Sequence, residues 1–230
     1  MRPFVLLVGA LAIAGLVACA AAPRQAVAPP AQAQQVDESP ETMLAEPIRW
    51  RRSVAVGRTN SGRLVHGVQL PSEGEDFFTW DPILNVKPNR PWRRYGTDRL
   101  VRSLLSVLAE FRAANPDAPR VGVGDLSRPA GGDFGPRYGP PGHASHQNGL
   151  DVDVYYPRLD RRERGPAQVA QVDRALAQDL VDRFVRAGAK FVFVGLHVGL
   201  SGSRRIVQAI PLHDNHMHVR VRESGNPAQP

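Results

Sequence analysis

Hydrophobic residues recur at helical spacing in two stretches of the chain. The first stretch contains Leu100, Val101, Leu104, Leu105, Leu108 and Phe111. This spacing predicts an amphipathic helix over residues 97–114, which ends before Pro116. The second stretch contains Val169, Val172, Leu176, Leu180 and Phe184. It predicts a second helix that ends near Gly188.

An alternating pattern between residues 150 and 156 predicts a strand. Leu150, Val152 and Val154 would lie on one face of this strand, and Asp151, Asp153 and Tyr155 on the other. We therefore expect a half-buried strand that presents carboxylates. Short apolar runs predict further strands at residues 53–57, 64–70, 121–126, 191–194, 206–210 and 216–221.

These elements together predict an α+β fold, with a mostly antiparallel central sheet and two main helices packed on it. Residues 77–95 are rich in proline and aromatic residues, so we expect that segment to be irregular. The length of 230 residues suits one domain with appendages. The predicted folded domain covers residues 46–223, and residues 224–230 form a tail.

The N-terminal segment has the pattern of an export signal. Arg2 precedes an apolar stretch from residue 4 to 17 that is too short to serve comfortably as a permanent membrane span. We predict a signal peptide over residues 1–19, followed by a flexible Ala/Pro/Gln-rich tether over residues 20–45. The protein is then expected in the periplasm or cell envelope.

The end of that signal, Leu16-Val17-Ala18-Cys19, resembles the lipobox of bacterial lipoproteins. Cys19 is the only cysteine in the chain, so it cannot form an internal disulfide. We expect lipidation of Cys19 and attachment to a membrane through it. The alternative is ordinary cleavage at this Ala-rich site without a lipid.

The chain carries a formal net charge of +7, with arginine in excess of lysine. A basic surface favours anionic partners, such as the acidic polymers of a cell wall. The charge is scattered, and no helix-turn-helix, zinc-finger or RNA-binding motif accompanies it. No nucleic-acid partner is therefore expected, and the oligomeric state is left open.

Five of the seven histidines fall in two short stretches, residues 142–153 and 213–220. His216 and His218 are two residues apart on a predicted strand, so their side chains share a face. If that strand lies beside the carboxylate-bearing strand, His146 and Asp153 can converge with this pair. Imidazole and carboxylate groups suit zinc, and three protein ligands leave a fourth position for water, as in catalytic sites.

We assign His146, Asp153 and His218 to the metal, and His216 to proton transfer or to stabilisation of a tetrahedral intermediate. The pattern alone leaves open which of His216 and His218 binds the metal and which acts in catalysis. His143 and His213 are expected either to orient the ligands or to bind a second metal. His66 and His197 stand apart and are interpreted as ordinary histidines.

Residues 145–153 (SHQNGLDVD) and 213–220 (HDNHMHVR) together resemble the penicillin-insensitive murein endopeptidases. These are grouped with lysostaphin-type and D-Ala-D-Ala metallopeptidases, which share a His…Asp…His-x-His zinc site. The resemblance covers residues 122–222. It implies that His146, Asp153 and His218 are the zinc ligands and that His216 is the catalytic histidine. It also matches His143 and His213 to additional histidines near the site.

Two further positions bear on specificity. Arg128 is loosely similar to a substrate contact of related peptidases; pairing with an acidic residue for structural reasons is the alternative. The D-Ala-D-Ala peptidases usually carry a small residue where Asp151 stands, which favours an endopeptidase over a carboxypeptidase. The lipobox and long tether are not what a freely periplasmic enzyme of this family would need.

The predicted function is zinc-dependent hydrolysis of peptidoglycan stem peptides at a cross-link of the D-Ala to diaminopimelate type. No serine nucleophile takes part, so β-lactams should not inhibit the reaction. One alternative is a D-Ala-D-Ala-type carboxypeptidase. Another is a zinc-containing lipoprotein that binds the cell wall without turnover. A purely structural metal is disfavoured, because the ligand set leaves a position open.

Overall fold

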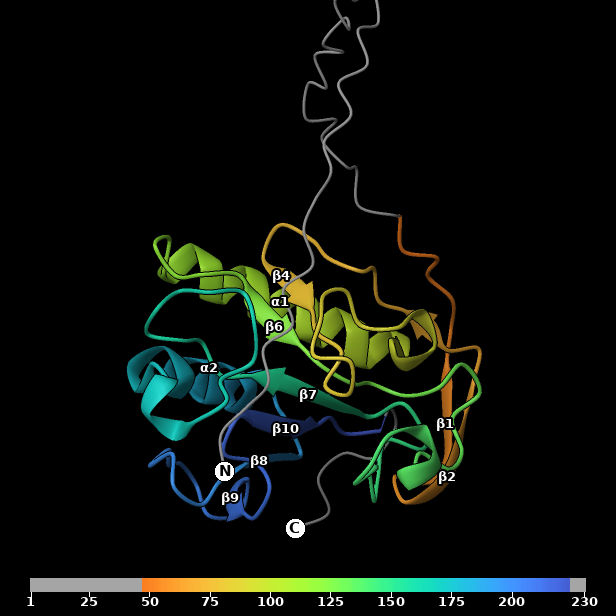
Figure 1. The fold of residues 1–230 in the computed structure, drawn as a ribbon. Coiled ribbons are helices and arrows are strands. Elements are labelled where there is room, and N and C mark those ends of the chain that lie inside the picture. Colours follow the sequence, from red (N-terminus) through yellow and green to blue (C-terminus); the bar gives the residue numbers. More distant parts are fainter. Residues whose placement is uncertain (1–46, 224–230) are drawn as a thin grey trace, which may run out of the picture. The chain divides into compact units, whose positions relative to one another are not determined.

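The computed structural model describes residues 47–223, which belong to one compact unit of the chain (Figure 1). The predicted signal peptide (1–19) with Cys19, the predicted tether (20–45) and the predicted tail (224–230) lie outside the described residues. These assignments stay predictions. Between residues 47 and 223, no helix has the length and apolar character that a bilayer span requires.

A six-stranded sheet forms the centre of the fold. In spatial order it contains β4 (Phe77–Thr79), β6 (Val121–Val123), β7 (Asp151–Tyr155), β10 (His216–Arg220), β8 (Phe191–Gly195) and β9 (Val207–Ile210). The three inner pairings are antiparallel, whereas β4 pairs with β6 and β8 with β9 in parallel.

The sheet is therefore mixed, and the prediction of a mostly antiparallel sheet was wrong in this respect. The parallel edge arises because the chain leaves β4, runs through the first helix and returns to β6, and such a crossover brings the chain back in the same direction. β4 lies within the segment that was expected to be irregular. The two predicted helices and the α+β composition are present.

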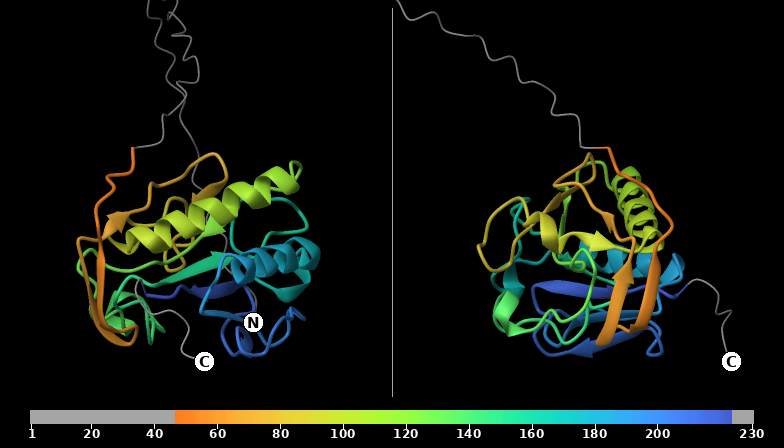
Figure 2. Two further views of the ribbon diagram at one scale, coloured as in Figure 1. Left: turned by 180° about the vertical axis from the view of Figure 1, so that it is seen from behind. Right: turned by 90° about the vertical axis from the view of Figure 1, so that its right-hand side faces the viewer.

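Both helices begin at a side-chain cap. Helix α1 (Asp98–Ala114) starts after Thr97, whose hydroxyl accepts a hydrogen bond from the Leu100 N–H at 3.1 Å. Helix α2 (Arg174–Arg186) starts after Asp173, several residues later than predicted, because residues 169–171 form a separate 3-10 turn. The two helices cover the same face of the sheet (Figure 2, left).

The hydrophobic core lies between these helices and the sheet. Val152 and Val154 of β7 and Met217 and Val219 of β10 are fully buried in it. Because side chains alternate along a strand, the neighbouring Asp and His residues of β7 and β10 project from the opposite face. All five residues of β7 are buried, so this strand is not half-buried as predicted.

A β-hairpin borders the opposite face of the sheet. It consists of β1 (Val54–Arg58) and β2 (Ser61–Val65), close to the predicted turn. The short strands β3 (Val68–Gln69) and β5 (Tyr95–Gly96) form a separate pair. Backbone hydrogen bonds from Leu64 to Ala130 at 2.9 Å and from Gly132 to Gly62 at 3.1 Å hold the hairpin against the loop that leads to β7.

Candidate metal centre

The register of β7 and β10 brings the two predicted motifs together. His218 lies directly opposite Asp153 in the antiparallel pair, so both side chains leave the same face of the sheet. His146 comes from the loop before β7, where its backbone adopts a left-handed conformation with φ of 65°. The backbone N–H of His146 donates to the Asp151 carboxylate at 3.1 Å, which helps to hold this conformation.

Three ligand atoms from these side chains form a nearly equilateral triangle. Nε2 of His146 lies 3.2 Å from Nδ1 of His218, and both nitrogens lie 3.3 Å from Oδ1 of Asp153. A tetrahedral zinc ion with ligands at about 2.0–2.2 Å requires ligand–ligand separations of roughly 3.3–3.6 Å. The spacing of the three atoms fits such an ion closely.

The hydrogen bonding around the triangle also suits a cation. Nδ1 of His146 donates to the Leu126 carbonyl at 2.5 Å, and Nε2 of His218 donates to Asp151 at 3.0 Å. Each imidazole therefore turns its second nitrogen toward the triangle, where that nitrogen could bind a metal ion. Oδ1 of Asp153 is buried and has no hydrogen-bond donor among residues 47–223. A metal ion would satisfy this oxygen.

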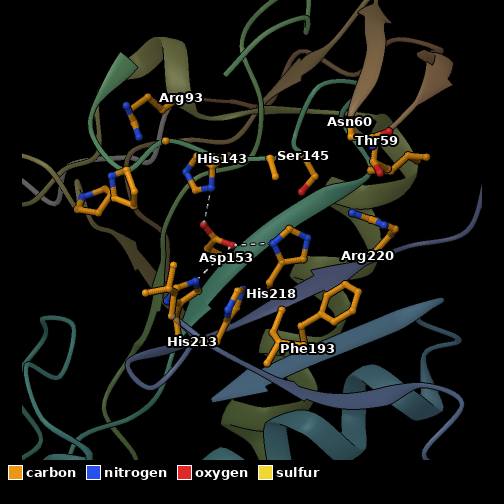
Figure 3. Close-up of a pocket in the computed structure, with 18 of the residues that line it drawn as sticks. Thr59, Asn60, Arg93, His143, Ser145, Asp153, Phe193, His213, His218 and Arg220 are labelled. Atoms are coloured by element: carbon orange, nitrogen blue, oxygen red, sulfur yellow. Dashed lines mark ion pairs between the residues drawn. The ribbon is translucent and has the colours of Figure 1, made fainter. Parts of the chain in front are cut away.

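His143 extends the cluster. Ligand atoms of His143, His146 and Asp153 lie within 4.8 Å of one another, so these three residues can also hold a metal. Nδ1 of His143 is 3.8 Å from Oδ2 of Asp153, a longer separation than those in the triangle (Figure 3). The shorter spacing therefore favours His218 over His143 as the third ligand.

A buried ion pair fixes the orientation of His143. Its Nε2 lies 2.7 Å from Oδ2 of Asp125, a fully buried carboxylate. Arg93 donates two hydrogen bonds to this carboxylate, at 2.6 and 2.5 Å. Burial alone would raise the pKa of Asp125, but Arg93 and His143 outweigh it and lower the pKa to about 2. Asp125 therefore stays charged and holds the imidazole in place.

His216 lies beside the triangle without joining it. Its Nε2 is 3.7 Å from Oδ1 of Asp153, and its Nδ1 donates to the Asn215 side-chain oxygen at 2.6 Å. Burial lowers the pKa of His216 to about 4, against the opposing charge of Asp153. The imidazole is therefore neutral near neutral pH, with a free acceptor at Nε2.

Neighbouring charges set the pKa values of Asp153 and His218, the two candidate ligands on the strands. Burial would raise the pKa of Asp153, but His146 and His216 keep it well below its usual value. For His218, burial lowers the pKa, but Asp151 and Asp153 outweigh burial and raise it to about 9. Asp153 is thus an anion throughout the neutral range.

Of the other predicted site residues, His213 lines the cavity beside the triangle, whereas Arg128 is not among the residues that line it. His213 lines the same cavity, with its ring 4.8 Å from that of His216 and its Nδ1 bonded to the Pro211 carbonyl at 2.6 Å. Arg128 donates to the Asp133 carbonyl at 2.9 Å and stacks on Tyr138. Its predicted substrate contact stays a prediction.

The triangle opens into a groove of about 1420 Å³. The turn between β1 and β2, the loop around residues 136–145, the start of β8 and the segment from residue 210 to 223 line this groove. Figure 3 shows His143, Asp153 and His218 facing one another within it. The candidate metal centre is therefore accessible to a ligand of peptide size.

Sequence reasoning missed the role of Asp151. Its carboxylate accepts hydrogen bonds from the His146 backbone, from Nε2 of His218 at 3.0 Å and from Nε of Arg220 at 2.6 Å. The sequence does predict that Asp151 and Asp153 share one face of the strand. It does not predict the register, which places Arg220 opposite Asp151.

The fold and the site define a class: α+β proteins in which histidine and aspartate side chains on a sheet can hold a metal at the floor of a groove. A sequence model of the family described as penicillin-insensitive murein endopeptidase matches residues 55–187, more than half of the chain. The chain belongs to the penicillin-insensitive murein endopeptidase family, which confirms the resemblance.

Curated relatives carry the same family name. A penicillin-insensitive murein endopeptidase of Escherichia coli O157:H7 is 32% identical over 129 residues, which cover 56% of this chain and 40% of the relative. The Haemophilus influenzae protein of that name is 27% identical, over 49% of this chain and 38% of the relative. The Yersinia pestis protein is 26% identical, over 75% of this chain and 67% of the relative. The match thus spans about two fifths of the first two relatives.

Proposed function

We propose that this protein is a zinc-dependent peptidase that hydrolyses peptide cross-links of peptidoglycan, of the D-Ala to diaminopimelate type. The observation that carries the proposal is the triangle of His146, Asp153 and His218, with separations of 3.2, 3.3 and 3.3 Å. Membership of the murein endopeptidase family supports the class of substrate.

The donor set suits zinc as the metal. Two imidazole nitrogens and one carboxylate oxygen would hold the ion and leave a position for water, as in catalytic rather than structural zinc sites. When bound, zinc polarises a substrate carbonyl and lowers the pKa of water from 15.7 to about 7. Proton transfer and the orientation of the ligands are proposed to depend on side chains of the protein.

His216 is the proposed proton carrier. Its Nδ1 is engaged by Asn215 at 2.6 Å, so Nε2 is the atom that can accept a proton from the attacking water. The same atom can then deliver that proton to the amine that leaves. The depressed pKa of about 4 keeps this atom unprotonated before the reaction.

Two positioning contacts complete the arrangement. Asp151 orients His218 from behind, and the Leu126 carbonyl orients His146, so both imidazoles are fixed before any ligand binds. The anionic Asp153 neutralises part of the charge of the ion. His143 and His213 line the groove and are proposed to support the site rather than to bind a second metal.

Digestion of defined cross-linked muropeptides tests the proposal. The zinc-loaded protein should cleave them, a chelator should abolish cleavage, and a β-lactam should have no effect. The variant His216→Ala should lose roughly 10²–10⁴-fold in turnover while it binds zinc normally. Cleavage that persists after removal of zinc would reject the mechanism. A His216→Ala variant with full activity would remove the proposed proton carrier.

The competing functions differ in product or in turnover. A carboxypeptidase would release a terminal D-alanine from monomeric stem peptides and leave cross-links intact. A non-catalytic lipoprotein would bind the cell wall with no product at all. The position of His216, with Nε2 3.7 Å from Oδ1 of Asp153, favours a peptidase over a purely binding role.

We also propose attachment of the protein to a membrane through a lipid on Cys19, with the segment 20–45 as its tether. This rests on the lipobox pattern alone. The variant Cys19→Ser should move the protein from the membrane fraction to the soluble fraction of the envelope. Retention of that variant in membranes would reject the anchor.

A further inference from the structure

The groove carries an excess of positive charge, part of it near the C-terminal end of β10. Its lining residues include five cations: Arg58, Arg93, Lys190, Arg220 and Arg222. Among the described residues that line the groove, the only carboxylates are those of Asp153 and Glu223. Asp153 belongs to the candidate metal centre, so Glu223 is the one other carboxylate among these lining residues.

These cations differ in how they are paired. Arg93 is buried and neutralised by Asp125. Arg58, Lys190 and Arg222 are exposed, and no carboxylate of residues 47–223 lies within ion-pair distance of them. Unpaired cations that line a cavity can bind an anionic group of a ligand.

Arg220 has a distinct arrangement. Its Nε donates to Asp151 at 2.6 Å, and its guanidinium lies 5.7 Å from the centre of the Phe193 ring. The two terminal nitrogens donate no hydrogen bond within residues 47–223. One edge of the guanidinium is therefore fixed by a buried carboxylate, and the other edge is available to a carboxylate of a ligand.

Arg220 lies close to the candidate metal centre, because it is on the same strand as His218. Arg220 follows His218 by two residues on β10, so it shares the same face about 7 Å further along the strand. Figure 3 shows Arg220 beside His218, on the side of the groove lined by Thr59 and Asn60. The backbone of Lys190 donates to the Arg220 carbonyl at 2.7 Å, so Lys190 lies next to it on the adjoining strand segment.

We propose that Arg220, assisted by Lys190 and Arg222, forms a subsite for a free carboxylate of the substrate peptide. This rests on the proposed peptidase function. An extended peptide advances about 3.3 Å per residue, so the carboxylate would lie within roughly two residues of the amide at the metal. A diaminopimelate residue in a cross-link keeps a free carboxylate within that reach. The subsite would select peptides with this group over amidated ones.

A pair of matched peptides tests the subsite. Binding of a cross-linked muropeptide with free diaminopimelate carboxylates is compared by calorimetry with binding of the same peptide carrying carboxamides. The zinc-loaded His216→Ala variant serves as host, and hydrolysis of both peptides is measured with the otherwise unchanged protein. We expect roughly tenfold tighter binding of the carboxylate form, and a preference that weakens as salt concentration rises.

Variants locate the preference within the groove. The double variant Lys190→Gln/Arg222→Gln removes two exposed side chains with no ion pair to disturb, and it should reduce the preference severalfold. Arg220→Gln should abolish the preference, and Arg220→Lys should restore only part of it, because lysine lacks the planar fork. Zinc content is measured for both Arg220 variants, since Asp151 also contacts His218. Arg204→Gln, which removes one positive charge outside the groove as Arg220→Gln does inside it, is the control.

The outcomes separate the subsite from the enzymatic proposal. Selective binding without hydrolysis would support the subsite and contradict the peptidase function. Hydrolysis of both peptides at equal rates and equal affinities would overturn the subsite and leave the peptidase function standing. Equal loss of preference in Arg204→Gln would also overturn it, because the effect would then come from net charge alone.

Discussion

Asp151 is the residue on which the geometry of the candidate metal centre depends most. It is fully buried and receives hydrogen bonds from the His146 backbone, the His218 ring and the Arg220 guanidinium. Burial raises the pKa of its carboxyl, but His218, His146 and Arg220 outweigh burial and hold it well below the usual value. It therefore remains an anion that holds both His146 and His218 in place.

Replacing Asp151 by Ala should weaken zinc binding by roughly 10–100-fold, because the His218 ring loses the carboxylate that orients it. Competition with a chromogenic chelator measures this affinity. Asp182→Ala serves as the control, because within residues 47–223 the Asp182 carboxylate accepts a hydrogen bond only from Gln178 in its own helix. Unchanged zinc affinity in the Asp151 variant would show that the ligands hold their positions without it.

At the scale of the elements, the most important pairing is that of β7 with β10. Their register sets His218 opposite Asp153 and Arg220 opposite Asp151. The alternation of each strand sends these four residues to one face and the valines to the helices. The candidate metal centre is thus formed by two adjacent strands and one loop.

The segment that follows β9 is held close to the end of β8. A Cβ added to Gly195 would lie 2.6 Å from both Asp214 Cα and the His213 carbonyl oxygen. The hydroxyl of Tyr156 connects these two segments. It accepts a hydrogen bond from the Gly195 N–H at 3.2 Å and donates one to the His213 carbonyl at 3.1 Å. The backbone that carries His213 can approach β8 only beside a glycine.

We expect Gly195→Ala to cost roughly 1–3 kcal/mol of unfolding free energy and to lower turnover, because the displaced segment carries Asn215, the partner of His216. Urea denaturation and muropeptide turnover measure the two effects. Gly135→Ala is the control, since its added Cβ would meet only the Asp133 side chain, at 3.1 Å. Equal stability of the two variants would contradict the close approach.

The helices and the strands that carry the site could be predicted from sequence, because their apolar residues recur with a clear period. The two parallel edges of the sheet could not. β4 has only three residues inside a proline- and aromatic-rich segment, and nothing local indicates its partner. The role of Asp151 was hidden for a related reason, since strand register arises from tertiary packing.

At the scale of the whole molecule, the two halves of the metal centre come from distant parts of the sequence. The family match, residues 55–187, contains His146 and Asp153 but ends before β10, which carries His216 and His218. The pairing of β7 with β10 in the central sheet brings the two halves together. Binding of a metal at this site would therefore require an intact fold.

An ionic network links several segments that lie far apart in the chain. Glu163 accepts from Arg120 at 2.6 and 2.8 Å and from Lys87 at 2.7 Å, and Arg120 also contacts Glu73. The bonds from Arg120, against a partial opposing effect of burial, lower the pKa of Glu163 from 4.5 to about 2. A carboxyl whose pKa falls on folding stabilises the folded state above its unfolded pKa.

The variant Glu163→Gln should therefore lose stability in a pH-dependent way. We expect a loss of roughly 1 kcal/mol at about pH 7, since the network is partly exposed to solvent. The loss should shrink as pH falls from 4.5 toward 2, because the parent protein then loses the same charge. Urea denaturation at about pH 7 and pH 3.5 measures it, with Glu110→Gln as a control. A loss of the same size at both pH values would contradict the assignment.

The most direct test of the metal centre is a crystal structure of the zinc-loaded protein with anomalous diffraction at the zinc edge. A single ion should lie about 2.0–2.2 Å from Nε2 of His146, Oδ1 of Asp153 and Nδ1 of His218, with its fourth position open to the groove. An ion bound by His143 in place of His218, or no ion at this triangle at full zinc loading, would contradict the account.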